Sequence, residues 1–245
     1  MSIHLHIVED AVDVARFASQ RIYAQIRERS DAVLGLATGS TPKATYAELV
    51  QMHRAGALSF AGVRSVNLDE YSGLDGAHEQ SYRRYMQKHL FDRVDIRPWN
   101  TFVPDGTAVD REAECRAYEE RIRALGGVNL WLLGIGSNGH IAFNEPGSSR
   151  DSRTRCVALS SETIADNSRL FAASTEVPRR AYTVGVGTIL EARRVLLLAT
   201  GAHKARAVAD ALQGNLGAQC PASFLREHAD CTFVIDCAAA SLLDG

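Results

Sequence analysis

One histidine and one carboxylate follow a glycine-rich turn near the middle of the chain. The segment 134–146 comes directly after an apolar run, 128–133, and has three glycines in its first six residues, before His140 and Glu145. Glycines let the backbone turn and approach a ligand closely. Parallel α/β proteins build their sites in such loops, at the carboxyl ends of central strands. The segment is therefore predicted to carry the chemistry, although a structural turn with an incidental histidine explains it equally well when it is taken alone.

Two adjacent carboxylates, Asp69 and Glu70, follow another apolar run at 63–68. Neighbouring side chains on an extended backbone point to opposite faces, so only one of the two is expected to enter a cleft at the edge of a sheet. The spacing does not say which one. An acid-rich turn without a catalytic role is the alternative interpretation.

Small residues at 38–41 lie between an apolar run at 32–37 and a predicted helix that starts at Pro42. Unpaired N–H groups and the helix dipole make such a junction a binding site for anions. Thr41 suits the N-cap position and Pro42 the first helical position. The P-loop lysine and the GxGxxG spacing are both absent, which favours a phosphate monoester over a nucleotide as the ligand. A capped turn that binds nothing is the alternative.

Two cations stand where they can reach an anion. Lys204 lies at another junction between a strand and a helix, and Arg169 lies within 147–180. Most lysines and arginines are solvated surface residues, so neither cation alone establishes a site. The segment 147–180, rich in Ser, Thr, Ala and Arg, is interpreted as a lid, with a surface excursion as the alternative. No cluster has metal-ligand spacing, so we expect no metal ion.

Short apolar runs alternate with amphipathic segments along the whole chain. The runs predict strands at 3–8, 32–37, 63–68, 101–103, 128–133, 155–159, 182–186, 195–199 and 231–235. Helical spacing predicts helices at 9–29, 42–54, 81–91, 111–125, 161–171 and 202–212, with another near Phe224. This alternation predicts a three-layer, Rossmann-like α/β fold, whose mostly parallel central sheet has helices on both faces. Since no segment has the composition of a linker, we expect one domain over 1–245, with 155–159 as an edge strand.

The composition excludes several classes of protein. A net charge of −2 with both signs interspersed does not suggest a nucleic-acid surface or a membrane anchor, and no run of about 18 apolar residues exists. The amino terminus enters a strand-like segment without the features of a signal peptide, so we expect a cytoplasmic protein. Its partner is expected to be a small molecule. The five cysteines have no CxxC spacing and are interpreted as spectator thiols.

Six segments, in this order, resemble the glucosamine-6-phosphate deaminase (isomerase) family. They are 36–42, 67–71, 134–149, 167–169, 183–188 and 201–205, and the likeness runs from about residue 3 to residue 237. The resemblance implies conversion of D-glucosamine 6-phosphate and water into D-fructose 6-phosphate and ammonia, as in amino-sugar catabolism. It also implies that neither a metal ion nor an organic cofactor takes part.

The resemblance assigns a role to each candidate residue. His140 matches the residue that opens the sugar ring, Glu145 matches the carboxylate that orients this imidazole, and Asp69 matches the base that removes the C2 proton. The contacts to the substrate and its phosphate fall on Thr38, Gly39, Ser40, Thr41, Gly136, Arg169 and Lys204. Binding energy at the remote phosphate is expected to hold C2 against Asp69.

Two positions depart from the family pattern. Asn138, counted with the catalytic residues, stands where many members have Asp beside the histidine. An amide can accept a hydrogen bond from the imidazole but adds no charge, so we expect a site that depends more on Glu145. Arg155 is followed by Cys156 and Val157 rather than by a lysine two positions on, and the carboxyl tail is short. Both features argue against activation by N-acetylglucosamine 6-phosphate and against the hexamer that accompanies it, and leave a monomer or another homo-oligomer open.

Other functions are compatible with parts of this pattern. A 6-phosphogluconolactonase has a similar fold and a similar loop, but the residues at 143–146 and 69–71 favour the deaminase. A deaminase or isomerase for galactosamine 6-phosphate is not excluded by the sequence. A transcription regulator that senses a sugar phosphate needs a helix-turn-helix before the first strand, and this chain starts at that strand.

Overall fold

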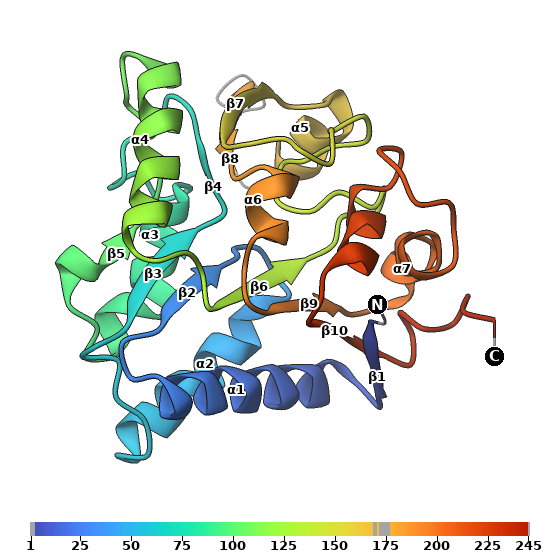
Figure 1. The fold of residues 1–245 in the computed structure, drawn as a ribbon, viewed down its shortest axis with the longest axis horizontal. Coiled ribbons are helices and arrows are strands. Elements are labelled where there is room, and N and C mark those ends of the chain that lie inside the picture. The colour runs from blue at the N-terminus through green and yellow to red at the C-terminus, as the bar shows by residue number, and fades with distance from the viewer. Residues whose placement is uncertain (1–2, 169–170, 172–176, 245) are drawn as a thin grey trace.

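A computed structural model describes residues 3–168, 171 and 177–244. Within these residues the centre is a sheet of seven strands, each parallel to its neighbours, in the order β1-β10-β9-β6-β2-β3-β5 (Figure 1). The predicted mostly parallel sheet is therefore confirmed. Its strands are β1 (His4–Val8), β2 (Val33–Leu36), β3 (Arg64–Asn67), β5 (Thr101–Phe102), β6 (Leu130–Gly134), β9 (Val195–Ala199) and β10 (Cys231–Asp236).

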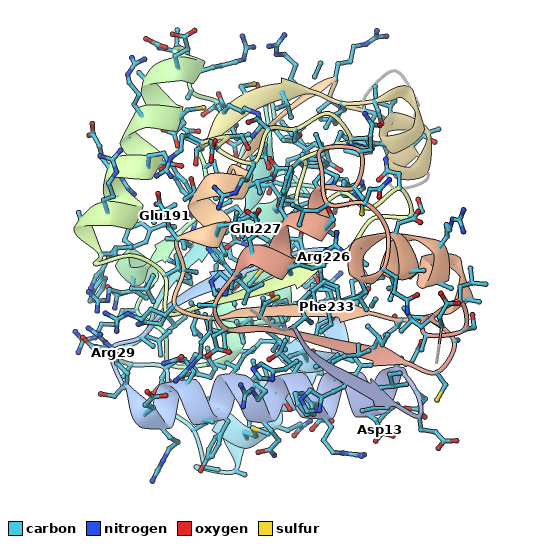
Figure 2. The ribbon with its side chains drawn as sticks, turned by 45° about the vertical axis from the view of Figure 1, so that its right-hand side comes forward. Asp13, Arg29, Glu191, Arg226, Glu227 and Phe233 are labelled. Atoms are coloured by element: carbon cyan, nitrogen blue, oxygen red, sulfur yellow. The ribbon has the colours of Figure 1, made fainter. Side chains whose placement is uncertain are left out.

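Helices cover both faces of this sheet, which gives the predicted three layers. One face packs against α1 (Ala11–Glu28), α2 (Pro42–Arg54) and α3 (Tyr82–His89). The other face packs against α4 (Arg111–Ala124), α6 (Val186–Leu190) and α7 (Ala205–Leu212). Figure 2 shows Asp13 and Arg29 near opposite ends of α1, away from Phe233, a fully buried residue of β10. Because an apolar core lies on each side of the sheet, the strands are apolar on both faces, as parallel sheets require.

Strand residues alternate between the two cores. Leu130 and Leu132 of β6 belong to the core under α1 and α2, whereas Trp131 and Leu133 belong to the core under α4 and α7. The indole of Trp131 lies over the backbone of Gly35 in β2, where a Cβ would be 1.7 Å from a ring carbon. Glycine is therefore the residue that lets this large side chain cross the neighbouring strand.

A second, smaller sheet was not predicted. It is antiparallel and has the order β4 (Asp69–Tyr71), β8 (Arg180–Thr183) and β7 (Arg155–Ala158). The strand expected at 155–159 does lie at an edge, but at an edge of this second sheet. The strand expected at 182–186 ends at Thr183, and Gly185 is the N-cap of α6. A Cβ at Gly185 would be 2.1 Å from the carbonyl oxygen of Ser152, so the residue at this position has to be glycine. The chain turns there into α6.

Several helices differ from the expected bounds. The segment 147–180 contains α5 (Ser161–Ser168), and the helix expected at 202–212 consists of the 3-10 turn η4 (Ala202–Lys204) followed by α7. The segment near Phe224 is a 3-10 helix, η5 (Pro221–Glu227), rather than an α-helix. No helix in the described ranges is long and apolar enough to cross a membrane.

Candidate active site

The candidate segments follow four adjacent strands of the parallel sheet. The sheet order β9-β6-β2-β3 places Lys204 after β9, the loop 134–146 after β6, residues 38–41 after β2 and Asp69 after β3. Parallel strands end at a common edge, so these residues share the carboxyl edge of the sheet. From β2 the chain continues to the neighbouring strand β3 on one side, whereas from β6 it continues in this sheet to β9 on the other side. The strand order therefore reverses between β2 and β6, and open α/β sheets bind their ligands at such a point.

The loop after β6 holds His140, Asn138 and Glu145 in one hydrogen-bonded chain. Nδ2 of Asn138 donates to Oε2 of Glu145 at 2.8 Å, so Oδ1 of the amide faces the histidine. His140 Nδ1 lies 2.8 Å from that Oδ1, which confirms the expected contact between the imidazole and Asn138. Because a carbonyl oxygen only accepts, the neutral ring carries its proton on Nδ1. Its Nε2 is then the nitrogen that can take a proton from a ligand.

Glycine is required at two positions of this loop. A Cβ at Gly136 would be 2.2 Å from Cε1 of His140, so only glycine lets the ring lie against the backbone. The N–H of Gly136 also donates to the carbonyl of His140 at 2.9 Å and closes the turn. Gly139 has a φ of +83° and lies against Cys220, whose Sγ would be 2.5 Å from a Cβ. Gly136 thus supports the histidine, and its expected contact with the substrate stays a prediction.

Glu145 is held by donors on both carboxylate oxygens. Oε2 accepts from Asn138, Oε1 accepts from the hydroxyl of Thr163 at 2.5 Å, and His140 Nδ1 lies 3.6 Å from Oε2. Burial raises the pKa of this carboxyl, but the His140 ring and the hydrogen bonds from Thr163 and Asn138 outweigh burial and lower the pKa to about 2. Glu145 is therefore ionised at neutral pH and can stabilise a positive charge on His140.

The two adjacent carboxylates have different tasks. Glu70 accepts hydrogen bonds from the backbone N–H groups of Tyr71, Tyr82 and Arg83 at 2.8, 2.9 and 2.9 Å, so it ties the start of α3 to β4. Asp69 is 7% exposed, and among the described residues its Oδ1 has no hydrogen-bond partner. The carboxylate of Glu70 is thus occupied by backbone donors, whereas Oδ1 of Asp69 is left without a partner among the described residues, which favours Asp69 as the candidate base.

The surroundings of Asp69 make it a stronger base. Burial raises the pKa of Asp69 well above its ordinary value, and the charge of Glu70 raises it further. Burial is the main cause of the raised pKa values of the Tyr71 and Tyr82 phenols, and the charge of Asp69 is a smaller contribution to both. A carboxylate whose pKa lies nearer neutrality removes a proton more readily once it is ionised.

Thr183 connects Asp69 to the histidine loop. Asp69 pairs with Thr183 across β4 and β8, and the N–H of Phe143 donates to Oγ1 of Thr183 at 3.1 Å. The Phe143 ring also stacks on Tyr82, with centroids 6.0 Å apart and planes at 7°, and lies 5.7 Å from the ring of Tyr71. Two segments that are distant in sequence are therefore held together by the small sheet and an aromatic cluster.

The loop 38–41 presents backbone N–H groups at the same edge. Its carbonyl side is anchored, because the hydroxyl of Tyr85 donates to the carbonyl of Gly39 at 2.7 Å. Gly39 has a φ of +99°, which favours glycine. Within the described residues no acceptor pairs with the N–H groups of Gly39, Ser40 and Thr41, and Thr38 is half-buried beside Tyr82. The loop can therefore receive an anion.

The predicted start of α2 is confirmed, but Thr41 does not cap the helix with its side chain. Pro42 is the first residue of α2, as expected, and Thr41 does occupy the N-cap position. The backbone of Thr41 is already helical, at φ −62° and ψ −48°, and its side chain makes no capping hydrogen bond. An N-cap hydroxyl needs an extended backbone to reach the N–H groups of the first turn. These N–H groups consequently stay uncapped by Thr41.

Of the two predicted cations, Lys204 lies among the described residues, and its role stays a prediction. Lys204 ends η4, and Gly201, the N-cap residue of η4, has a φ of +86°. The N–H of Gly201 donates to both carboxylate oxygens of Asp236 at 3.0 and 2.9 Å. Asp236 on β10 thereby fixes the turn from which Lys204 projects. Arg169 lies outside the described residues.

Asn144 and Thr163 are parts of the site that the sequence analysis did not identify. Asn144 is buried; its Nδ2 donates to two backbone carbonyls at 3.0 and 2.8 Å, and its Oδ1 accepts from Arg155 at 2.8 Å. It fixes the backbone between His140 and Glu145, and the only signal for it was its place in the segment 143–146. Thr163 gave no signal, since 18 residues separate it from Glu145.

An open parallel sheet that carries a histidine–amide–carboxylate chain and a buried carboxylate at its carboxyl edge defines an α/β enzyme equipped for acid–base catalysis. Comparison with known sequences makes this assignment specific. The chain belongs to the family of glucosamine-6-phosphate isomerases and 6-phosphogluconolactonases, whose model matches residues 9–234.

Individual relatives agree with this family. The chain is 53% identical over 237 residues to a glucosamine-6-phosphate deaminase of Shewanella loihica, covering 97% of this chain and 88% of the relative. A solved structure described as a monomeric glucosamine-6-phosphate deaminase is 44% identical, with a TM-score of 0.96 over 98% of this chain and 100% of its own. A 6-phosphogluconolactonase from Trypanosoma cruzi shares the fold with a TM-score of 0.80, over 100% of this chain and 99% of its own, at 22% identity.

Proposed function

We propose that this enzyme converts D-glucosamine 6-phosphate and water into D-fructose 6-phosphate and ammonia, a step of amino-sugar catabolism. Its relatives at 53% and 49% identity over nearly the whole chain carry the name of that deaminase. The observation that carries the proposal is the pairing of two proton-transfer groups at one sheet edge. These groups are His140, backed by Asn138 and Glu145, and the buried Asp69.

His140 opens the sugar ring. Opening moves a proton from the anomeric hydroxyl to the ring oxygen, and Nε2 of a neutral imidazole can take the first proton and return it to the second atom. The ring is positively charged between these two transfers. The ionised Glu145, 3.6 Å from Nδ1, stabilises that charge, and Asn138 fixes the ring in the tautomer that exposes the lone pair of Nε2.

Asp69 is the base that acts on the open-chain sugar. Its carboxylate takes the proton from C2, the electron pair of that C–H bond forms the C1–C2 double bond, and the π electrons of the C1 carbonyl pass to O1, which takes a proton, so that an enolamine forms. A proton is then added at C1 while the lone pair of the C2 nitrogen forms a C=N double bond, which gives an imine at C2. The resulting C2 imine is hydrolysed by water, which gives the ketone and releases ammonia. Oδ1 of Asp69, which has no hydrogen-bond partner in the described part of the chain, is the oxygen assigned to this transfer.

The phosphate of the substrate is assigned to the loop 38–41, with Lys204. The open N–H groups of this loop and the amino terminus of α2 favour a dianion, and the ammonium group of Lys204 adds a charge-assisted contact. Arg169 is assigned to the same phosphate from the family resemblance, since it lies outside the described residues. A phosphate held here uses remote binding energy to orient C2 toward Asp69.

The alternative reactions are those of enzymes that share this fold and act on other substrates. The lactonases among the compared structures resemble this chain at 16–24% identity, which supports a shared fold and nothing more specific. Galactosamine 6-phosphate differs from the proposed substrate at one hydroxyl, and we propose glucosamine 6-phosphate from the names of the closer relatives. A sugar-phosphate-sensing module without activity is the least favoured of the alternatives.

The setting of the enzyme is also proposed. We expect a cytoplasmic protein that acts without a nucleic-acid or membrane partner, as a single domain over 1–245. We expect a monomer or a small homo-oligomer rather than an allosteric hexamer, and the 44% identical structure is described as monomeric. The interpretation of 147–180 as a lid stays a prediction.

One assay separates the candidate reactions. The purified protein is given glucosamine 6-phosphate or galactosamine 6-phosphate while ammonia and ketose phosphate are measured, and 6-phosphogluconolactone while acid release is measured. We expect ammonia and fructose 6-phosphate in equal amounts from glucosamine 6-phosphate. Lactone hydrolysis without ammonia release would replace this proposal with the runner-up.

A further inference from the structure

A threonine on α5 reaches into the catalytic chain. Thr163 is 8% exposed, and its hydroxyl donates to Oε1 of Glu145 at 2.5 Å. This is a contact between the segment 147–180 and the carboxylate that lies behind His140. The comparisons and the family resemblance assign no role to Thr163.

The orientation of the Thr163 hydroxyl is fixed by Ser160. Ser160 precedes the first residue of α5, and its Oγ accepts the backbone N–H of Thr163 at 3.1 Å. The Ser160 hydroxyl also donates to Oγ1 of Thr163 at 3.0 Å. Since Oγ1 already accepts one hydrogen bond, its own proton is directed to the remaining partner, Glu145. A chain of hydrogen bonds thus runs from the start of α5 through Glu145 and Asn138 to His140.

We propose that Thr163 is a positioning residue for the deamination, which fixes the Glu145 carboxylate against Asn138 and His140 and makes this catalytic chain depend on the placement of α5. The inference rests on the proposed function, because it gives Thr163 a part in that reaction. Thr163 acts through Glu145 and does not itself touch the reacting atoms.

The electrostatics of Glu145 agree with this role. Burial raises its pKa, and the hydroxyl of Thr163 belongs with the His140 ring and Asn138 to the groups that lower it to about 2. In the described part of the chain, His140 is the titratable side chain that faces Glu145. Loss of the Thr163 hydroxyl removes one charge-assisted donor, so the pKa of Glu145 moves upward and its side chain is less constrained.

The test compares variants that differ by one hydroxyl. Thr163→Val keeps the shape of the side chain and removes the donor, whereas Thr163→Ser keeps the donor. We expect kcat to fall roughly tenfold in Thr163→Val, as for loss of a hydrogen bond to a charged group, with a smaller change in KM and with recovery in Thr163→Ser. Thr163→Ala beside Thr163→Ser gives the same comparison with a smaller side chain, should the valine variant fold poorly.

Thr188→Val is the matched control. The buried hydroxyl of Thr188 also donates to a carboxylate, that of Glu119 at 2.6 Å, but it does not contact Glu145. Thr188→Val therefore shows how far kcat falls when a comparable buried hydrogen bond is lost away from the catalytic chain. Equal losses of kcat in Thr163→Val and Thr188→Val, an unchanged kcat in Thr163→Val, or a failure of Thr163→Ser to restore kcat would each overturn the proposal.

A second measurement decides the role of Thr163 without the reaction. The side-chain carboxyl carbon of Glu145, assigned by Glu145→Gln, is followed by NMR as the pH is lowered. We expect it to begin titrating at higher pH in Thr163→Val than in the wild type, and identical curves would contradict the proposal. A wild type that releases no ammonia would instead refute the proposed function, and the two failures are therefore distinguishable.

Discussion

Asp69 combines a catalytic advantage with a cost to folding. Its burial and the neighbouring charge of Glu70 raise its pKa, and its Oδ1 has no partner among the described residues. Both features suit the carboxylate to the proposed removal of the C2 proton. Both also destabilise the ionised form in the folded protein. Active sites commonly keep such unfavourable groups because function requires them.

Replacement of Asp69 separates proton transfer from binding. Asp69→Asn keeps the shape of the side chain but cannot accept a proton from C2. We expect exchange of the C2 hydrogen with solvent deuterium to be lost while the variant still binds glucosamine 6-phosphate, as measured by NMR and by calorimetry. Exchange at the wild-type rate would remove Asp69 as the base.

The same variant changes how stability depends on pH. An acid whose pKa is raised by folding binds its proton more tightly in the folded than in the unfolded state. The contribution of Asp69 to the free energy of unfolding is therefore most favourable at pH values below its ordinary pKa of 3.8. This contribution is lost as the pH rises from there through the raised pKa of the folded protein. We expect Asp69→Asn to gain unfolding free energy relative to the wild type as pH increases above about 5, in urea titrations. Asp92→Asn, at an exposed site, is the control, and parallel curves for wild type and Asp69→Asn would contradict the burial argument.

Gly136 is predicted to act on catalysis through His140. A methyl group at Gly136 would lie 2.2 Å from the imidazole, so Gly136→Ala must move the ring. Misplacement by about 1 Å can lower a rate roughly 100-fold, and we expect a loss of that order in kcat. Gly134→Ala is the matched control, because a Cβ at Gly134 meets nothing within 4 Å. Similar kinetics for the two variants would show that the ring does not depend on this contact.

At the scale of elements, the sequence predicts strands and helices better than the way in which strands pair. The apolar runs at 63–68 and 128–133 correspond to β3 and β6, and α1 begins after a capping aspartate, Asp10, close to the expected start. The three-residue strand β4 could not be anticipated, because its pairing with β8 depends on residues more than 100 positions away. Long-range pairing leaves no local pattern in the sequence.

The same difference between local patterns and long-range contacts applies to the residues of the candidate site. The loop 134–146 could be predicted because its glycines, histidine and carboxylate are close in sequence. The choice between Asp69 and Glu70 could not, since it depends on α3, whose first N–H groups bind Glu70. Thr163 was missed for a related reason, because only the packing of α5 brings its hydroxyl to Glu145.

The junction after β9 is predicted to serve substrate binding. Lys204→Ala removes one charge-assisted contact to the phosphate, which corresponds to about 1.5–3 kcal/mol, or a rise in KM of roughly 10- to 100-fold. We expect a smaller change in kcat, measured from initial rates of ammonia release. Lys88→Ala, at an exposed position of α3, should leave KM unchanged. An unaltered KM in Lys204→Ala would place the phosphate elsewhere.

At the scale of the molecule, strand order explains why these distant segments meet. The chain places β3 on one side of β2 and β6 on the other, so the loops after β2 and β6 diverge around one crevice. Solved lactonases share this fold at low identity, so the topology provides a position for a site and not a particular reaction. The reaction depends on which side chains occupy the strand ends, and the proposed function assigns it above all to His140, Asn138, Glu145 and Asp69.

The face around Arg155 leads to a prediction about regulation. The Arg155 guanidinium already donates to Oδ1 of Asn144 at 2.8 Å and to Oγ of Ser148 at 3.0 Å, and the next residues, Cys156 and Val157, add no second cation. An effector phosphate that binds at Arg155 would have to displace these contacts. It would also meet one positive charge, where an Arg-x-Lys pair offers two. We expect N-acetylglucosamine 6-phosphate to leave a hyperbolic rate curve unchanged in initial-rate measurements, with the mass from light scattering unaltered by the effector. A sigmoid curve that becomes hyperbolic on addition of the effector would show that this face still carries an allosteric site.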